Sequence, residues 1–429
     1  MTKGITSASK RLIAYLADRK HIHLYIMALG LLCAVLFCFA VYPNMQKNVS
    51  SEDHLDPDQH GNLAYGIMFY HTFSYYPDNE PTVERGPFYP AFIAALLLVT
   101  HDWWPYSVQL GQCILFALMC GLVFYISDKL WGRRVAVVTS VISAVHPLAI
   151  WYTSRIWIET MSMLLFMAIL AGMLYVIERP TLRRALLLGG ALAAASLTKS
   201  TFVPYILVAP VLVWLLAAKE ARLRTSIAVF LVSVLLVAPW TVRNLKLTGR
   251  FIPVHARLGY NMEMGDELVE RWSSSPLCLA EMWGACMLRT MGVEAEIPNE
   301  LPKWRRELLM DDRLMAMSME RYRANPIFML KKMAINGIMF WTVGSFPGNS
   351  LMMSAALLPL LLLVVISTVI LWRRRQILSI MGAHLLLMFL YYAMHLPVEA
   401  IARYSVVLLP AMIMYGIGPI VQSLFEDKR

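Results

Sequence analysis

One polar segment, Ser50–Pro90, gathers side chains that can transfer protons and bind anions in a chain that otherwise avoids charge. It reads SSEDHLDPDQHGNLAYGIMFYHTFSYYPDNEPTVERGPFYP. Asp56 and Asp58 carry carboxylates that can accept a proton as a general base, and His60 lies beside them in the sequence. Arg85 can bind an anionic group such as a phosphate. A connecting loop needs only solubility, so we interpret this segment as the reaction centre.

Further charged and polar residues stand in the short turns at the outer ends of several apolar runs, although positive charge is favoured on the cytoplasmic side. They are Arg155, Glu159, Lys199, Arg243, His395, Glu399, Arg403 and Tyr404. Any one of the cations could be an interfacial anchor, and Glu159 could pair with Arg155, four residues away on a helical face. Their coincidence favours a site for an anionic lipid headgroup beside a general base.

The composition indicates that membrane-spanning helices must position these residues. Of 429 residues, 58% are hydrophobic and only 15% are charged, and apolar runs long enough to cross a bilayer recur, which is typical of a polytopic membrane protein. The formal net charge is +10, but the basic residues form short clusters between apolar runs. This is the positive-inside pattern of a membrane protein and gives no support to nucleic-acid binding.

The apolar runs predict an all-α fold with about ten transmembrane helices. The first is uncleaved with its N-terminus in the cytoplasm, which places Ser50–Pro90 on the opposite side. Residues 86–104 have too short an apolar core, and 326–346 contain Lys331 and Lys332, so both are predicted to be juxtamembrane or interfacial helices. The predicted spans are about 23–42, 105–127, 135–153, 159–178, 184–198, 202–218, 225–241, 351–372, 378–394 and 404–422.

The whole chain, residues 1–429, is predicted to form one membrane-embedded domain with two outer segments. Residues 44–104 form an acidic loop with the juxtamembrane helix, and residues 244–346 form a loop with short helices. Cys278 and Cys286 lie in the second segment, where a disulfide remains open because spacing alone does not establish pairing.

The predicted spans carry no Asp, Glu, Lys or Arg near their middle, and His146 and His384 are the ionisable exceptions. A coupled transporter usually keeps ionisable groups or broken helices at the bilayer midplane. The distribution therefore favours an enzyme with a site at the membrane surface. A lipid-linked sugar flippase or another transporter is the alternative, since it would also need cations that bind phosphate.

Several short motifs follow one another along the chain in a fixed order. The segment DPDQHGNLA fits D-x-x-x-aromatic-x-x-x-A, with a histidine at the aromatic position. Further motifs are R-x-P-x-Y-P, an acidic residue after a proline-containing turn, P-W-x-x-R-N with a downstream G-x-N, and R-Y before an apolar span ending in P. The matching residues are Asp56, His60 and Ala64; Arg85, Pro87, Tyr89 and Pro90; Pro147 and Glu159; Pro239, Trp240, Arg243, Asn244, Gly259 and Asn261; and Arg403, Tyr404 and Pro410.

Through these motifs the chain resembles the polytopic C-superfamily (GT-C) glycosyltransferases that use polyprenyl-phosphate sugars. These are related to protein O-mannosyltransferases and aminoarabinose transferases. The resemblance implies an inverting transfer of a sugar to an acceptor hydroxyl outside the cytoplasm, with Asp56 as general base and Asp58 as the neighbouring alternative. An aspartate with an ordinary pKa of about 3.9 would need no tuning for this role.

The resemblance also implies roles for the other candidates. Lys199, Arg243, Arg403 and Arg85 would bind the donor phosphate, and Glu159, His60, Tyr404, Glu399 and His395 would contact substrate. No cofactor is required because cations can stabilise the leaving phosphate, although Asp53, Asp56 and Asp58 leave a divalent cation open. The expected partners are the lipid donor, a glycolipid, glycan or protein acceptor, and the bilayer. The expected location is a bacterial inner membrane with the site on the periplasmic face.

Overall fold

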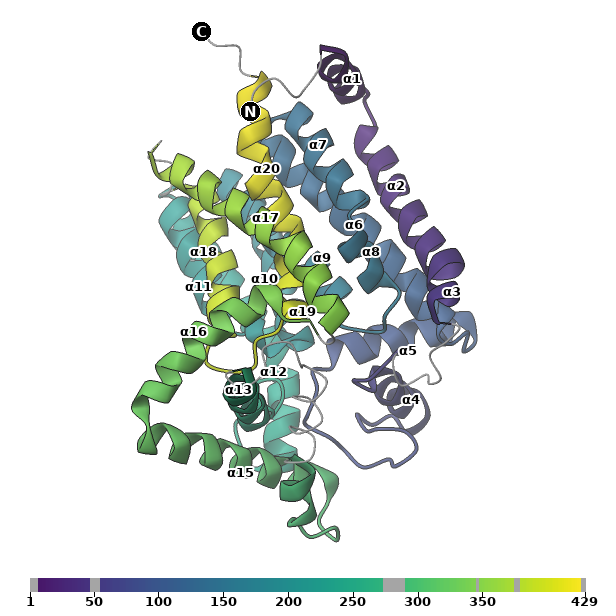
Figure 1. Ribbon diagram of the computed structural model, residues 1–429, viewed down its shortest axis with the longest axis vertical. Coiled ribbons are helices and arrows are strands. Elements are labelled where there is room, and N and C mark those ends of the chain that lie inside the picture. The colour runs from purple at the N-terminus through teal and green to yellow at the C-terminus, as the bar shows by residue number, and fades with distance from the viewer. Residues whose placement is uncertain (1–6, 47–54, 273–289, 345–346, 374–378, 426–429) are drawn as a thin grey trace.

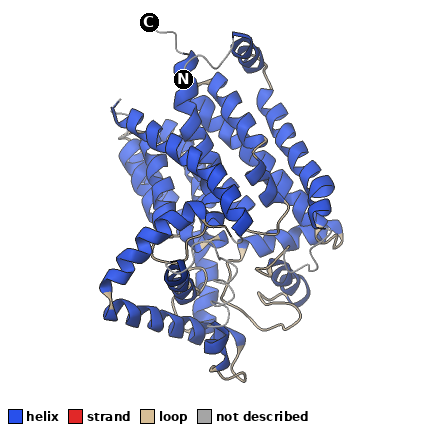
Figure 2. Cartoon of the chain, in the orientation of Figure 1, coloured by secondary structure: helices blue, strands red, loops and turns tan. Residues whose placement is uncertain are grey.

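The computed structural model describes residues 7–46, 55–272, 290–344, 347–373 and 379–425. These residues form helices joined by loops, and none of them belongs to a β-strand (Figure 2). The predicted all-α fold is therefore confirmed. Asp53, Cys278 and Cys286 lie outside the described residues, so the metal and disulfide alternatives that involve them stay open.

Six described helical spans are long and apolar enough to cross a membrane. The first, Ile22–Met45, joins α2 (Ile22–Leu36), a π-helical turn (Phe37–Val41) and α3 (Tyr42–Gln46). A seventh exists if α7 (Arg133–Ala144) and α8 (Pro147–Thr153), which are bent by 54° at a short break, count as one span. The others are α6 (Tyr106–Trp131), α9 (Glu159–Glu178), α12 (Arg222–Thr248), Ser350–Arg373 in α17 (Pro347–Arg373), and Ala402–Phe425, which joins α19 (Ala402–Ser405), a 3₁₀ turn (Val406–Leu408) and α20 (Leu409–Phe425).

The predicted count of about ten spans is not confirmed. Three runs predicted to span form the shorter helices α10 (Leu182–Thr198), α11 (Tyr205–Leu216) and α18 (Ile380–Ala393). Their 17, 12 and 14 residues extend only about 18–26 Å at a rise of 1.5 Å per residue, less than a bilayer core of about 30 Å. They nevertheless pack against the long helices, α10 on α9 and α12, and α18 on α9 and α11.

A second layer of helices covers one end of the bundle, which we call the loop end. Figure 1 shows this layer below the bundle, while both chain termini and α1 (Ser7–Ala17) lie at the opposite end. The helix α5 lies across the bundle rather than along it, consistent with a juxtamembrane helix. The layer consists of α4 (His60–Tyr70), α5 (Phe88–Thr100), α13 (Leu258–Trp272), α15 (Lys303–Ala324) and α16 (Pro326–Thr342).

Burial separates central from peripheral helices. Within their most apolar windows, α9 and Ala402–Phe425 are 67% and 78% buried, whereas α12 and Ser350–Arg373 are each only 28% buried. The peripheral helices therefore expose apolar side chains such as Leu235 and Leu362, as expected where lipid surrounds the bundle. The two central helices begin at or beside Glu159 and Arg403, so these two residues stand on closely packed helices.

A buried ion cluster joins α13, α15 and α16. The Lys332 ammonium of α16 lies 2.6 Å from the Asp266 carboxylate of α13, and both side chains are fully buried. Arg321 of α15 pairs with Asp266 at 2.7 Å and with Glu263 at 3.0 Å. Lys332 is thus committed to helix packing within the loop-end layer.

Candidate active site

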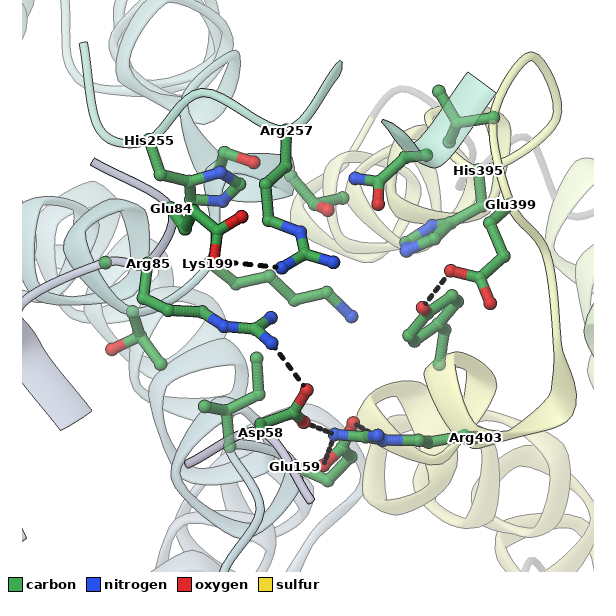
Figure 3. Close-up of a pocket in the computed structure, with 18 of the residues that line it drawn as sticks. Asp58, Glu84, Arg85, Glu159, Lys199, His255, Arg257, His395, Glu399 and Arg403 are labelled. Carbon is green, nitrogen blue, oxygen red and sulfur yellow. Dashed lines mark hydrogen bonds and ion pairs between the residues drawn. The ribbon is translucent and has the colours of Figure 1, made fainter. Parts of the chain in front are cut away.

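Six chain segments meet at the loop end around a cavity of about 130 Å³ (Figure 3). Each segment lies at the beginning or the end of a helix, so the bundle and the outer layer together fix its position. The cavity is lined by Asp58 and His60 before and at the start of α4, Glu84 and Arg85 before α5, Glu159 at the start of α9, Lys199 after α10, His255, Arg257 and Asn261 around the start of α13, and His395, Glu399, Arg403 and Tyr404 after α18.

An ion-pair network centred on Asp58 forms one wall. Its carboxylate oxygens lie 3.0 Å from Arg85 Nη2 and 2.7 Å from Arg403 Nη2. Arg403 Nε also donates to Glu159 Oε1 at 2.6 Å. Burial would raise the pKa of Asp58, but the guanidinium groups of Arg85 and Arg403 outweigh it and hold this pKa well below its usual range. Asp58 is therefore ionised at neutral pH.

A close backbone approach delivers Arg85 to this wall. A Cβ atom on Gly86 would overlap with the carbonyl oxygen of Leu197, in the last turn of α10. Only glycine lets the two backbones come this near. Pro87 follows and caps the start of α5, so the glycine and proline of the R-x-P motif set Arg85 beside the end of α10.

Lys199 occupies a different position among the cations. Its ammonium donates to Tyr391 Oη at 3.0 Å and lies 4.2 Å from the centre of the Tyr404 ring. Within the described part of the chain, Arg85, Arg257 and Arg403 each pair with a carboxylate, whereas Lys199 forms no ion pair. Burial lowers the pKa of Lys199 to about 8. Figure 3 shows its side chain extending into the cavity.

His255 and Arg257 are cavity residues that were not predicted from the sequence. Arg257 Nη1 lies 3.6 Å from Glu84 Oε2, and its guanidinium stacks 4.1 Å over the Tyr260 ring. Burial lowers the pKa of His255 to about 3, so this imidazole is neutral. Both residues stand between the P-W-x-x-R-N and G-x-N motifs, which is the signal that could have drawn attention to them.

The wall opposite Lys199 is polar and contains Glu399, His395 and Tyr404. Tyr404 Oη donates to Glu399 Oε2 at 2.7 Å, while Glu399 Oε1 has no hydrogen-bond partner among the described residues. His395 stacks on the Tyr404 ring with centroids 5.1 Å apart. Burial raises the pKa of Glu399 and lowers that of His395 well below its ordinary value. This wall therefore offers a ligand the Oε1 atom of Glu399 and the ring of a neutral His395.

Asp56 does not line the cavity. Its two carboxylate oxygens accept the backbone N–H groups of His60 at 2.9 Å and Gly61 at 2.6 Å, which caps the first turn of α4. Burial raises the pKa of Asp56 to about 6. The expectation that Asp56 has an ordinary pKa is thus wrong, because the cap holds it in a buried place.

His60 behaves as the aromatic residue of its motif. Its ring packs edge-on against Tyr89 with centroids 5.0 Å apart and is 4% exposed. Burial lowers its pKa to about 3, so it stays neutral. A histidine at the aromatic position of the motif therefore still supplies a ring that packs on Tyr89.

Arg243 is not brought to the cavity, although it was predicted to bind phosphate there. Its guanidinium donates to the carbonyl oxygens of Thr82 at 2.7 Å and Phe73 at 3.4 Å and lies over the Trp240 ring. Because α12 continues to Thr248, Arg243 lies within a helix rather than in a turn. Arg155 also lies outside the cavity lining, over the rings of Trp151 and Trp157.

Among the described residues, no group of three or more His, Cys, Asp or Glu side chains is arranged to hold a metal ion. The Asp58 and Glu159 carboxylates are engaged by Arg403, and Glu84 lies near Arg257. In the described residues, these three carboxylates therefore face guanidinium groups, which carry the positive charge beside them.

Comparison with known proteins was made on sequence and on structure. Residues 84–242, less than half of the chain, match the family model for dolichyl-phosphate-mannose-protein mannosyltransferase. No curated protein matches the chain. The archaeal oligosaccharyltransferase AglB from Archaeoglobus fulgidus, solved with an inhibitory peptide and a dolichol-phosphate, aligns with a TM-score of 0.56 at 12% identity. That alignment covers 94% of this chain and 50% of AglB, so the chain spans about half the length of that enzyme.

A second structure of the Archaeoglobus fulgidus oligosaccharyltransferase, tethered to an acceptor peptide, aligns with a TM-score of 0.56 at 14% identity over the same shares of the two chains. ArnT from Cupriavidus metallidurans bound to undecaprenyl phosphate gives a TM-score of 0.41 at 15% identity, over 91% of this chain and 77% of ArnT. The predicted resemblance is confirmed by the family match and by the fold of the oligosaccharyltransferase. The protein is thus an integral membrane protein that resembles the GT-C glycosyltransferases in its fold and, over residues 84–242, in its sequence.

Proposed function

We propose that this protein transfers a sugar from a polyprenyl-phosphate donor to an acceptor hydroxyl. The observation that carries the proposal is Lys199, a partly buried cation in the cavity that forms no ion pair among the described residues. A partly desolvated charge without a counter-ion is unfavourable, and a phosphate group would supply the missing charge. The family match over 84–242 and the AglB fold support a polyprenyl-type carrier.

In this mechanism the donor phosphate binds Lys199 and the nearby Arg257, whose 3.6 Å contact with Glu84 leaves it loosely paired. As the bond between the sugar and the phosphate breaks, negative charge grows on the phosphate oxygen. A fixed ammonium and a fixed guanidinium stabilise that charge without reorganisation. Arg85 and Arg403 contribute to the same positive field while they hold Asp58.

We assign the general base to Asp58, with Asp56 as the residue that fixes α4. A general base must first reach the proton, and only then does its pKa matter. Asp58 lines the cavity and is ionised, with its two oxygens paired to Arg85 and Arg403, whereas Asp56 lies outside the cavity lining and accepts backbone N–H groups. Attack by the activated hydroxyl on the side opposite the leaving phosphate would invert the configuration at the sugar.

The polar wall formed by Glu399, His395 and Tyr404 would hold sugar hydroxyls. Glu399 Oε1 is an available acceptor, and the neutral His395 donates Nδ1–H to the Tyr391 carbonyl oxygen, so its Nε2 is an acceptor. Glu159 and His60 complete the cavity beside Asp58. We also place the cavity on the periplasmic face of a bacterial inner membrane, because the basic N-terminus lies at the opposite end of the bundle.

The test is transfer of a radiolabelled sugar from a polyprenyl-phosphate donor by the purified protein in detergent. Lys199→Met should lower kcat/KM by about 10²–10³-fold, since it removes the cavity cation that stabilises the leaving phosphate. The matched control is Lys219→Met, because Lys219 is exposed and lies outside the cavity. Equal activity of Lys199→Met and wild type would overturn the proposal. If the protein moves the labelled lipid from one leaflet of a liposome membrane to the other and transfers no sugar, the result would instead support the flippase alternative.

A further inference from the structure

The segment Thr82–Arg85 contains the cavity residues Glu84 and Arg85, and Glu307, far along the chain, contacts this segment. Glu307 of α15 is 8% exposed and lies against Thr82, which is fully buried. Thr82 Oγ1 donates to Glu307 Oε1 at 2.6 Å, and the backbone N–H of Val83 donates to Glu307 Oε2 at 2.9 Å. One carboxylate therefore fixes both the side chain and the backbone of this segment.

The Thr82 hydroxyl extends this contact toward the cavity. It also accepts the backbone N–H of Glu84 at 3.2 Å, so it joins the Glu307 carboxylate to the Glu84 backbone. Glu84 then lies near Arg257 at 3.6 Å, and the next residue, Arg85, pairs with Asp58 at 3.0 Å. The hydrogen bonds of Glu307 thus lead directly to the residues of the cavity wall.

Two further contacts hold the same segment from other sides. Arg243 Nη1 of α12 donates to the Thr82 carbonyl oxygen at 2.7 Å. The Ala256 N–H donates to the Val83 carbonyl oxygen at 2.9 Å, which ties the segment to the residues on either side of Ala256, His255 and Arg257. The backbone of Thr82–Arg85 is therefore located by α12, α15 and the segment before α13 together.

A carboxylate at position 307 has a specific chemical use. In its ionised form it is a pure acceptor with two oxygens, so it can satisfy an O–H donor and an N–H donor at once. An amide of the same shape has one acceptor oxygen. With that oxygen on the Val83 N–H, its NH₂ group would donate to Thr82 Oγ1, and the Thr82 O–H would lose its acceptor. A buried donor left without its acceptor costs free energy, which the segment would relieve by moving.

We propose that Glu307 is a positioning residue that sets Glu84 and Arg85 in the cavity through the Thr82 hydroxyl and the Val83 amide. The role rests on the proposed glycosyl transfer, in which Arg85 orients the Asp58 base. Glu307 touches neither donor nor acceptor. Its loss should change the chemical step more than donor binding, because Lys199 stands on a different segment, although Arg257 is tied to Thr82–Arg85 through Ala256 and Glu84.

The experiment compares Glu307→Gln with Glu320→Gln, an exposed glutamate on the same helix. Hydrogen–deuterium exchange is measured on peptides covering residues 80–87, together with kcat and the donor KM. Glu307→Gln should raise exchange in these peptides and lower kcat by up to about 100-fold, with a much smaller change in KM, since misplacement of about 1 Å can cost that much. Glu320→Gln should match wild type in all three measurements.

A second pair of variants separates positioning from folding. Thr82→Val removes the hydroxyl, while Thr82→Ser keeps it, so the serine variant should restore both low exchange and kcat. Equal defects in the two variants, unchanged exchange in Glu307→Gln, or raised exchange across distant peptides would each overturn the proposal. If wild type transfers no sugar at all, the proposed function fails, while the exchange measurement still decides whether Glu307 holds the segment.

Discussion

At the scale of single residues, the cavity contains cations in two different electrostatic states. The guanidinium groups are paired with carboxylates and keep their charge at any physiological pH. Lys199 is partly buried and has no such partner among the described residues, and burial lowers its pKa to about 8. A lysine can therefore lose its charge in a pH range where an arginine cannot.

This difference gives a pH dependence for wild type. Below pH 8 Lys199 is protonated and binds phosphate; above pH 8 it is neutral, so kcat/KM for the donor should fall about tenfold per pH unit. Lys199→Arg should keep its charge and show no such decline, even if its activity is lower. Measurement of kcat/KM across neutral and alkaline pH checks this. A wild-type profile that stays flat to pH 10, near the ordinary lysine pKa of about 10.4, would contradict it.

Variants of Asp56 and Asp58 test which of the two aspartates is the general base. Asp58→Asn should lower kcat by about 10²–10⁴-fold, because an amide cannot take the acceptor's proton. Asp56→Asn keeps one acceptor for the first turn of α4, so it should cost about 1 kcal/mol of stability and much less activity. Thermal unfolding and transfer kinetics of both variants check this prediction. The reverse order of activities would return the base assignment to Asp56.

At the scale of elements, two backbone segments near the cavity approach their neighbours so closely that only glycine fits. Gly86 lets the segment before α5 touch the last turn of α10, and Gly265 of α13 likewise lies against the Val398 carbonyl oxygen. These contacts bring Arg85 and the segment after α18 to the cavity. The local sequence marks the glycines, but only packing shows which neighbours they meet.

Gly86→Ala should displace Arg85 from Asp58, because the added methyl group overlaps with the Leu197 carbonyl oxygen. We expect kcat to fall at least about tenfold and stability to fall by roughly 1–3 kcal/mol. Gly190→Ala on α10 is the matched control, since nothing lies within 4 Å of its added Cβ atom. Kinetics and thermal unfolding of both proteins check the prediction, and equal behaviour of the two variants would refute it.

At the scale of the whole molecule, a buried ion cluster holds the outer layer together below the bundle. The Asp266 carboxylate accepts hydrogen bonds from Lys332 at 2.6 Å, Arg321 at 2.7 Å and Tyr322 at 2.7 Å. Three donors from α15 and α16 thus converge on one group of α13. The same helix carries Asn261 to the cavity, so the cluster supports the site through the layer.

Asp266→Asn should leave the buried Lys332 without its counter-charge and lower the free energy of unfolding by about 3–5 kcal/mol. Asp312→Asn is the control, because the Arg250–Asp312 pair is about half exposed, with side-chain exposures of 52% and 49%. Such a surface pair is worth about 0–1 kcal/mol. Thermal and denaturant unfolding in detergent check the difference. A similar small loss in both variants would show that the cluster is not needed for stability.

Composition and motif order determined the class of this protein, because hydrophobic runs and glycine or proline positions are local properties of the chain. They predicted an all-α membrane protein that resembles GT-C glycosyltransferases, and they marked Asp58, Arg85, Lys199 and Arg403. Their count of about ten spans is not confirmed, since an apolar run such as 378–394 does not show that its helix, α18, has only 14 residues.

Only the tertiary structure decided which charged groups face one another. In the structure, Asp56 caps the first turn of α4 and Arg243 lies outside the cavity. His255 and Arg257 line it. The distances between helix ends depend on packing among segments hundreds of residues apart, as with Asp58 and Arg403. Whether a cation is paired or free to bind phosphate depends on those distances, and no short stretch of sequence contains them.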